Sequence, residues 1–334
     1  MIPGTATIRQ VPAWQAELAR AVTEPTELLQ LLGLGQEWQA AAEAAARSFP
    51  LRVPRGFVAR MQRGNRHDPL LRQVLPLAEE LGNVPGYSVD PVGDLAALRA
   101  PGVLQKYHGR VLLTATGACA VHCRYCFRRH FPYHEAQASA DHWSAALAHI
   151  AADPDVEEVI LSGGDPLTLS DRRLQEFIQA LTAISHVRRL RLHTRLPIVL
   201  PERVTPELCA MLNQSRLATV IVVHANHANE IDSTVRSACD LLADSGVVLL
   251  NQSVLLRGIN DTPEALADLS QAVFNARVLP YYLHLLDRVH GAAHFEVSED
   301  EAKKLLDMVA SRLPGYLVPR LVREVAGAAY KQPL

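Results

Sequence analysis

The chain has 334 residues, of which 49% are hydrophobic and 20% are charged, and its formal net charge at pH 7 is −2. This is an ordinary globular composition, and a charge so close to zero gives no sign of nucleic-acid or membrane binding through bulk electrostatics. The sequence contains no apolar run long enough for a transmembrane helix.

The N-terminal region, residues 1–100, is expected to be helical and irregular. Segment 23–35, TEPTELLQLLGLG, has Thr and Pro at a helix start, Leu at helical spacing and Gly at the end. Segment 37–50, EWQAAAEAAARSFP, is a strong helix former that stops at Pro50. Residues 1–18 lack the charged start and apolar run of a secretory signal. The number of cysteines in the chain is odd, which favours a reduced, cytoplasmic setting.

From residue 101 to residue 334, strands alternate with helices. The predicted strands are 110–116, 156–164, 187–195, 217–226, 247–256 and 278–286. The predicted helices are 138–153, 170–184, 205–214, 230–246, 262–276 and 298–313. Such alternation predicts an α/β fold with a parallel sheet, and six units predict a partial TIM-like (β/α)6 barrel. In barrels of this kind the chemistry lies at the C-terminal ends of the strands.

Three of the five cysteines, Cys119, Cys123 and Cys126, stand in the stretch CAVHCRYCF directly after the first predicted strand. One interpretation is a zinc site, which needs a fourth ligand. Three nearby histidines are candidates for that ligand: His122, His130 and His134. Other interpretations are free thiols, or a four-cysteine cluster completed by Cys209 or Cys239. Those two cysteines fall in predicted helices and are expected to be core residues.

A cubane cluster has four irons, so three thiolates leave one iron open to bind a small molecule through oxygen and nitrogen. The spacing C-x3-C-x-aromatic-C resembles the signature of the radical S-adenosylmethionine (SAM) superfamily. The resemblance implies that Cys119, Cys123 and Cys126 hold a [4Fe–4S] cluster, that SAM chelates the fourth iron, and that its reductive cleavage yields a 5′-deoxyadenosyl radical. It also implies that Tyr125 packs near the adenine.

The stretch LSGGDP after the second predicted strand looks like the second SAM-binding motif of this superfamily. The resemblance implies that Gly163 and Gly164, with Asp165, allow the backbone to approach the methionine amino group of SAM. The alternative is a plain turn after a strand.

Longer segments are similar to the lysine 2,3-aminomutase family. They include KYHGRVLLTATGACAVHCRYCFRRHF, NQSVLLRGIND and GYLVPRLVREVAGAAYKQPL, and the resemblance spans roughly residues 85–331. Within the family, the short chain looks most like the bacterial enzyme that makes (R)-β-lysine for translation elongation factor P. The resemblance implies free L-lysine as substrate, an electron donor, and a separate ligase that attaches the product to elongation factor P.

The family uses pyridoxal 5′-phosphate (PLP) as a further cofactor. Lys331 in GAAYKQP matches the family's catalytic PLP lysine, although a lysine so near the end of a chain is usually a solvated tail. Lys106 and Arg110 stand in the segment that holds the PLP phosphate in the family. The first of these is more often arginine there, and lysine binds phosphate without a bidentate fork. Surface cations beside a strand are the alternative.

Opposite charges are expected at the two ends of the bound substrate. Arg128 matches the family's arginine for the substrate carboxylate, and Asp287 matches one of two acids for the ε-ammonium. Glu324 falls where the second acid is aspartate in the catabolic aminomutases, so its extra methylene leaves the identity of the substrate slightly open. Solvated loop charges are the alternative for both acids.

Two weaker matches are His224 and Gln252, which align with residues near SAM in the family. His193, Thr194 and Arg195 end the third predicted strand, and we assign them no role. Three rival functions stay open: an aminomutase for another amino acid, a radical enzyme without PLP, and a non-catalytic iron–sulfur protein.

Overall fold

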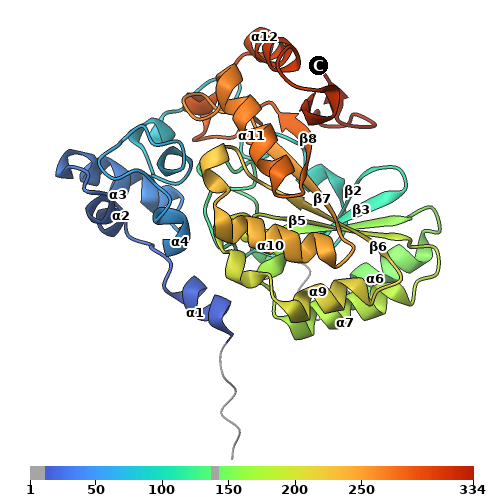
Figure 1. The fold of residues 1–334 in the computed structure, drawn as a ribbon. Coiled ribbons are helices and arrows are strands. Elements are labelled where there is room, and N and C mark those ends of the chain that lie inside the picture. The colour runs from blue at the N-terminus through green and yellow to red at the C-terminus, as the bar shows by residue number, and fades with distance from the viewer. Residues whose placement is uncertain (1–11, 137–142) are drawn as a thin grey trace, which may run out of the picture.

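The computed structural model describes residues 12–136 and 143–334. In this part of the chain, ten strands form one curved sheet in sequence order (Figure 1). The strands are β1 (Leu98–Ala100), β2 (Val103–Tyr107), β3 (Arg110–Thr116), β4 (Glu158–Gly163), β5 (Arg189–Thr194), β6 (Ala218–Val223), β7 (Val248–Val254), β8 (Leu279–His284), β9 (Arg320–Arg323) and β10 (Gln332–Pro333). Neighbours from β3 to β9 are parallel, and antiparallel strands flank them on both sides.

The predicted α/β partial barrel is confirmed, because β3–β8 are the six predicted strands. The structure adds a seventh parallel strand, β9, which the sequence analysis did not assign. Arg320–Arg323 has only two apolar residues between arginines, so it lacks the apolar run of a buried strand. The short antiparallel strands β1, β2 and β10 were also not predicted.

Helices cover the outer face of the sheet and form the N-terminal region (Figure 1). They are α1 (Ala13–Ala19), α2 (Pro25–Leu32), α3 (Gln39–Ser48), α4 (Arg55–Val58), α5 (Tyr133–Ala136), α6 (Trp143–Ala152), α7 (Asp171–Thr182), α8 (Leu196–Val199), α9 (Pro206–Asn213), α10 (Ser233–Asp244), α11 (Pro263–Asn275) and α12 (Glu299–Ala310). The helix predicted over 138–153 corresponds to α6, and its first residues lie outside the described part. The prediction that residues 1–18 are not a secretory signal also concerns mainly residues that are not described.

The crossover helices begin where a short polar side chain caps the first turn. In each case its oxygen accepts a hydrogen bond from a backbone N–H three residues on, which supplies a partner that the helix cannot provide. The capping residues of α7, α9, α10, α11 and α12 are Ser170, Thr205, Asp232, Thr262 and Ser298.

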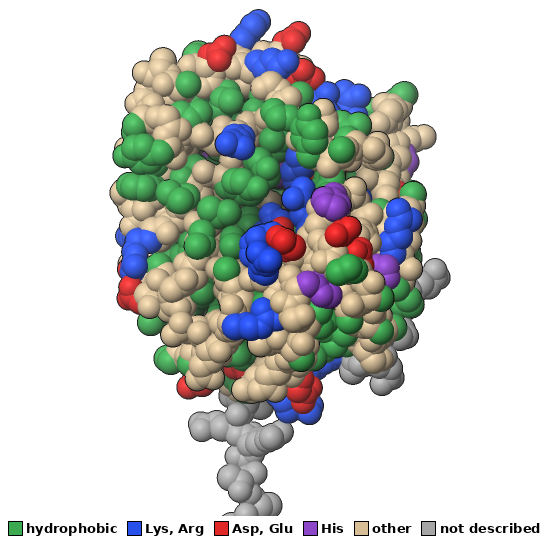
Figure 2. All heavy atoms as spheres, turned by 90° about the vertical axis from the view of Figure 1, so that its right-hand side faces the viewer, with side chains coloured by type: hydrophobic (Ala, Val, Ile, Leu, Met, Phe, Trp, Pro, Cys, Tyr) green, Lys and Arg blue, Asp and Glu red, His purple; other side chains and the backbone are tan. Residues whose placement is uncertain are grey.

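The N-terminal helices share a hydrophobic core with the barrel. Trp14, Leu28 and Phe57 belong to the same buried cluster as Leu113 of β3 and Phe177 of α7. The face shown in Figure 2 mixes hydrophobic side chains with basic, acidic and histidine side chains, so neither sign of charge forms a continuous patch there. In the described ranges no helix has the length and apolar character needed to cross a membrane.

A buried ion cluster fastens the cysteine loop to the N-terminal region. Arg124 Nε and Nη2 donate to the two carboxylate oxygens of Glu80 at 2.8 and 2.5 Å, and Arg129 Nη2 donates to Glu80 Oε2 at 2.8 Å. The three side chains are at most 1% exposed. Both guanidinium groups also lie over the ring of Phe49. One carboxylate is therefore shared by two buried cations beside the cysteines.

We expect Glu80→Gln to lower the free energy of unfolding by about 3 kcal/mol, because two buried guanidinium groups lose their counter-charge. Urea denaturation followed by circular dichroism measures this change. The matched control is Glu176→Gln, which breaks an exposed pair with Arg172 and should leave the midpoint unchanged. Equal midpoints for the two variants would contradict the role of the cluster.

Candidate functional site

The cysteine loop follows β3 and carries three partly buried, unbridged thiols. Burial raises the pKa of Cys119 well above its usual value, and the Cys126 and Cys123 thiols raise it further. Burial also raises the pKa of Cys126 to about 11, with Cys123 adding to the effect. Thiols that are close together and hard to ionise fit a group that brings positive charge, as the irons of a cluster do. In the described ranges, no three His, Cys, Asp or Glu side chains are arranged to hold a single metal ion.

The glycines of LSGGDP pack directly on this loop. A Cβ on Gly164 would lie 2.2 Å from the carbonyl oxygen of Ala118. Gly163 has φ +112°, and a Cβ there would lie 2.7 Å from the carbonyl oxygen of Thr116. The Gly164 N–H donates to that Thr116 oxygen at 2.7 Å. These positions require glycine because two backbones touch.

Asp165 ties the same motif to the end of β5. Its Oδ1 accepts hydrogen bonds from the Thr194 hydroxyl at 2.7 Å and the Leu167 N–H at 3.0 Å, and its Oδ2 accepts from the Arg195 N–H at 2.7 Å. Burial raises the pKa of Asp165 to about 6 in spite of these bonds. Both of its oxygens therefore bind protein groups and hold the strand ends together.

Arg195 connects the cysteine loop to a buried polar network. Its Nη1 donates to Cys123 Sγ and to the Tyr125 hydroxyl, both at 2.8 Å. Its Nη2 donates to Glu230 Oε2 at 3.0 Å and to Gln73 Oε1 at 2.5 Å. The resemblance to radical SAM enzymes implies that Tyr125 packs near the adenine of SAM. The structure shows that its hydroxyl belongs to this network.

Strands β5, β7 and β8 and the residue after β6 carry buried polar atoms without partners. Among the buried side-chain atoms that lack a hydrogen-bond partner in the described part of the chain are four from this region: His193 Nε2, His224 Nε2, Gln252 Oε1 and His284 Nε2. Burial lowers the pKa of all three histidines, to about 3 for His224, so the imidazoles are neutral. Buried polar atoms in folded proteins are almost always paired, so this row of atoms fits a polar ligand.

A chain of alternating charges also belongs to the site. Lys331 Nζ is 2.7 Å from Glu324 Oε2, and Lys106 Nζ is 3.3 Å from Glu324 Oε1. Lys106 Nζ is also 2.6 Å from Asp94 Oδ1, and Arg128 Nε is 2.6 Å from Asp94 Oδ2. The predicted PLP lysine, Lys331, is thus brought together with Lys106 and Arg128 through two carboxylates.

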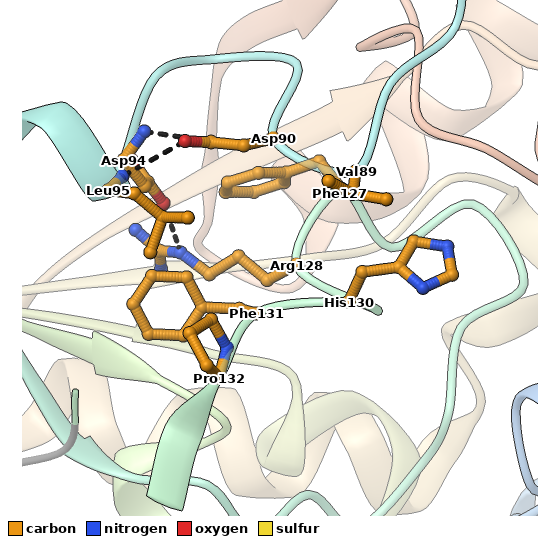
Figure 3. A pocket seen from close by; sticks show the side chains of 9 residues that line it. All are labelled: Val89, Asp90, Asp94, Leu95, Phe127, Arg128, His130, Phe131 and Pro132. Carbon is orange, nitrogen blue, oxygen red and sulfur yellow. Dashed lines mark hydrogen bonds and ion pairs between the residues drawn. The ribbon is translucent and has the colours of Figure 1, made fainter. Parts of the chain in front are cut away.

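Arg128 is held rigidly at one end of this chain (Figure 3). Its guanidinium lies 4.9 and 5.9 Å from the ring centroids of Phe127 and Phe131, and its Nη1 donates to Ser162 Oγ at 3.1 Å. Asp94 is itself fixed, because its backbone N–H donates to the Asp90 carboxylate at 2.8 Å. An arginine fixed on several sides is suited to bind a carboxylate in one orientation.

The two predicted substrate acids differ in charge state. Burial favours the neutral form of Glu324, but Lys331 and Lys106 outweigh burial and lower its pKa to about 2. Burial raises the pKa of Asp287 to about 7, against the opposing effect of Lys331. The remaining predicted cation, Arg110, lies over the ring of Tyr107 at 4.8 Å. Arg110 therefore lies beside the charge chain, which it approaches through Tyr107.

The sequence analysis missed three residues of the site. Asp94 pairs with both Arg128 and Lys106, and the Tyr107 hydroxyl donates to Glu324 Oε1 at 2.9 Å. His284 ends β8 with an unpaired ring nitrogen. His284 could have been predicted, because it is a polar residue at the C-terminal end of a strand. Asp94 lies in a Pro- and Gly-rich loop and offered no such signal.

Comparisons with known proteins show what this chain is similar to. Residues 113–270 match the model of the radical SAM superfamily. The chain is 51% identical to L-lysine 2,3-aminomutase of Escherichia coli, over 96% of this chain and 94% of that protein. It is 46% identical to L-lysine 2,3-aminomutase of Haemophilus influenzae, over 99% and 98%. A solved radical SAM methyltransferase from Sphaerobacter thermophilus aligns with 66% of this chain and 68% of that chain, at TM-score 0.44 and 15% identity.

We expect Gly164→Ala to reduce the iron and sulfide bound per chain after anaerobic reconstitution by about half or more. The added Cβ would overlap the Ala118 carbonyl and displace the cysteine loop. Colorimetric iron and sulfide analysis measures the loss. Gly315→Ala is the control, because a Cβ there meets nothing within 4 Å. Full cluster content in Gly164→Ala would show that the close contact does not position the cysteines.

Proposed function

Because the chain belongs to the L-lysine 2,3-aminomutase family of the radical SAM superfamily, we propose that it converts free L-lysine to (R)-β-lysine by moving the amino group from C2 to C3. It is an isomerase of the intramolecular aminotransferase type. The observation that carries this choice of substrate is the arrangement of charges, with Arg128 at one end of the chain of ion pairs and Glu324 toward the other.

The side chains and backbone of the site provide suitable binding groups for three cofactors. Cys119, Cys123 and Cys126 would hold a [4Fe–4S] cluster, and Lys331 and Lys106 would hold PLP. The polar atoms that β5–β8 leave unpaired, together with the backbone of LSGGDP, would contact SAM. When bound, the cluster and SAM supply a radical that removes hydrogen from the substrate, and PLP stabilises the migrating amino group.

The protein's own contribution is to hold the amino acid at both ends. Arg128 would bind the carboxylate, and Asp287 and Glu324 would bind the ε-ammonium. An amino acid without a terminal amine would leave Asp287 and Glu324 Oε2 without an ammonium from the substrate, which disfavours its binding in this partly buried site. The same acids disfavour glutamate as a substrate. Substrate fixed in one orientation keeps the reacting carbons in place during the rearrangement.

We further propose that the product serves the modification of translation elongation factor P in the cytoplasm. A separate ligase would attach (R)-β-lysine to a lysine of that factor, and an electron donor would reduce the cluster. The support for this role is the resemblance to the short bacterial members of the family.

Anaerobic assay of the reconstituted protein tests the proposed reaction. With SAM, PLP, dithionite and L-lysine, we expect β-lysine by chromatography, and no product from Cys126→Ala or Lys331→Ala. Cleavage of SAM with unchanged lysine would contradict the substrate and leave the radical chemistry intact. Absence of SAM cleavage would support a non-catalytic iron–sulfur protein.

The charge state of Asp287 predicts that KM for lysine depends on pH. Its raised pKa means that the carboxylate is neutral below about pH 7 and charged above it. Because only the charged form attracts an ammonium, KM for lysine should fall as pH rises through about 7. Asp287→Asn should raise KM about tenfold or more and abolish this fall. A wild-type KM that does not change between pH 6 and 8 would contradict the role of Asp287.

A further inference from the structure

Lys331 stands against the acid that the proposed function gives to the substrate ammonium. Its Nζ is 2.7 Å from Glu324 Oε2, and the two side chains are 26% and 12% exposed. It is also the cation that most lowers the pKa of Asp287, against the effect of burial, which raises that pKa. The ammonium of Lys331 therefore lies near both acids. A protein lysine and a free lysine carry the same group, a primary ammonium on a four-carbon stem.

The backbone sets this contact. Strands β9 and β10 are antiparallel, and Arg323 pairs with Gln332. Toward the turn between the two strands, the next residues are Glu324 after β9 and Lys331 before β10. Continuation of the register places these two residues across from each other. Glu324 Oε1 is occupied by the Tyr107 hydroxyl at 2.9 Å and by Lys106 at 3.3 Å. The other oxygen, Oε2, faces the ammonium of Lys331.

We propose that Lys331 occupies the ε-ammonium subsite in the PLP-free protein, and that attachment of Lys331 to PLP first opens the subsite to the substrate. This inference rests on the proposed function and describes how the same site is regulated. It makes Glu324 a shared residue that binds the protein's own ammonium first and the ammonium of the substrate afterwards. PLP loading would therefore precede productive binding of lysine.

The chemistry of attachment gives the contact a measurable consequence. The Lys331 ammonium must first release a proton to solvent. The neutral Nζ then attacks the aldehyde carbon of PLP, and the C–O bond breaks with loss of one water as the C=N bond forms. Glu324 Oε2 holds Lys331 Nζ at 2.7 Å, so this contact must break before Nζ can reach the aldehyde. A second ammonium that binds Glu324 would release Lys331 and speed up attachment.

The probe for this competition is 6-aminohexanoate, which has the carboxylate and ε-ammonium of lysine but no α-amino group to react with PLP. The full chain is reconstituted with its cluster, freed of PLP, and mixed with PLP without SAM or reductant. The absorbance of bound PLP follows the rate. Borohydride reduction and peptide mass spectrometry identify the modified lysine.

We expect 6-aminohexanoate to accelerate attachment to wild-type Lys331 about threefold to fivefold, the scale of one partly exposed ion pair. Hexanoate, which lacks the ammonium, should have no effect. Glu324→Gln should load faster than wild type by a similar factor and be insensitive to 6-aminohexanoate. Glu301→Gln, an exposed carboxylate paired with Arg257, is the matched control and should behave as wild type.

Slower loading of Glu324→Gln would overturn the inference, because it would mean that the pair only orders the hairpin. No acceleration, or slowing, by 6-aminohexanoate in the wild type would overturn it as well. Failure of the proposed function gives a different result: PLP would attach to a lysine other than Lys331, or would not attach at all, in wild type and variants alike.

Discussion

A charge that leaves bulk water must meet an opposite charge, and this constraint organises the candidate site. The chain of pairs runs from Arg128 through Asp94, Lys106 and Glu324 to Lys331. Its members come from the cysteine loop, the loop before β1, strand β2 and the hairpin of β9 and β10. The sheet order leaves the barrel open between its first and last strands, and these side chains bridge that opening. The same ion pairs therefore close the fold and prepare the site.

A second network fixes the cysteines. Arg195 reaches Cys123 and Tyr125 from the end of β5, while Asp165 holds the backbone of Arg195. The buried carboxylate of Glu80 holds Arg124 in the middle of the cysteine loop. The loop is thus attached to the barrel on one side and to the N-terminal region on the other. Such support keeps three thiols in fixed positions, which a cluster with one open iron requires.

The fold was predictable because six apolar strands alternate with helices of clear periodicity, and local patterns carry that information. The cysteine spacing likewise predicted the superfamily, since all three cysteines lie within one loop. Asp94 and strand β9 were missed for a common reason. Asp94 becomes meaningful only when Arg128 and Lys106 from other segments pack against it, and β9 becomes a strand only when β8 offers it a partner. Pairings between distant segments leave no local pattern in a sequence.

The most direct measurement is a crystal structure of the protein loaded with cluster, SAM and PLP and soaked with L-lysine under anaerobic conditions. We expect the substrate carboxylate on Arg128, the ε-ammonium between Asp287 and Glu324, and Lys331 displaced from Glu324. Lysine bound with its ε-ammonium away from both acids, or Lys331 still paired with Glu324 beside a bound substrate, would contradict the assignment of this site.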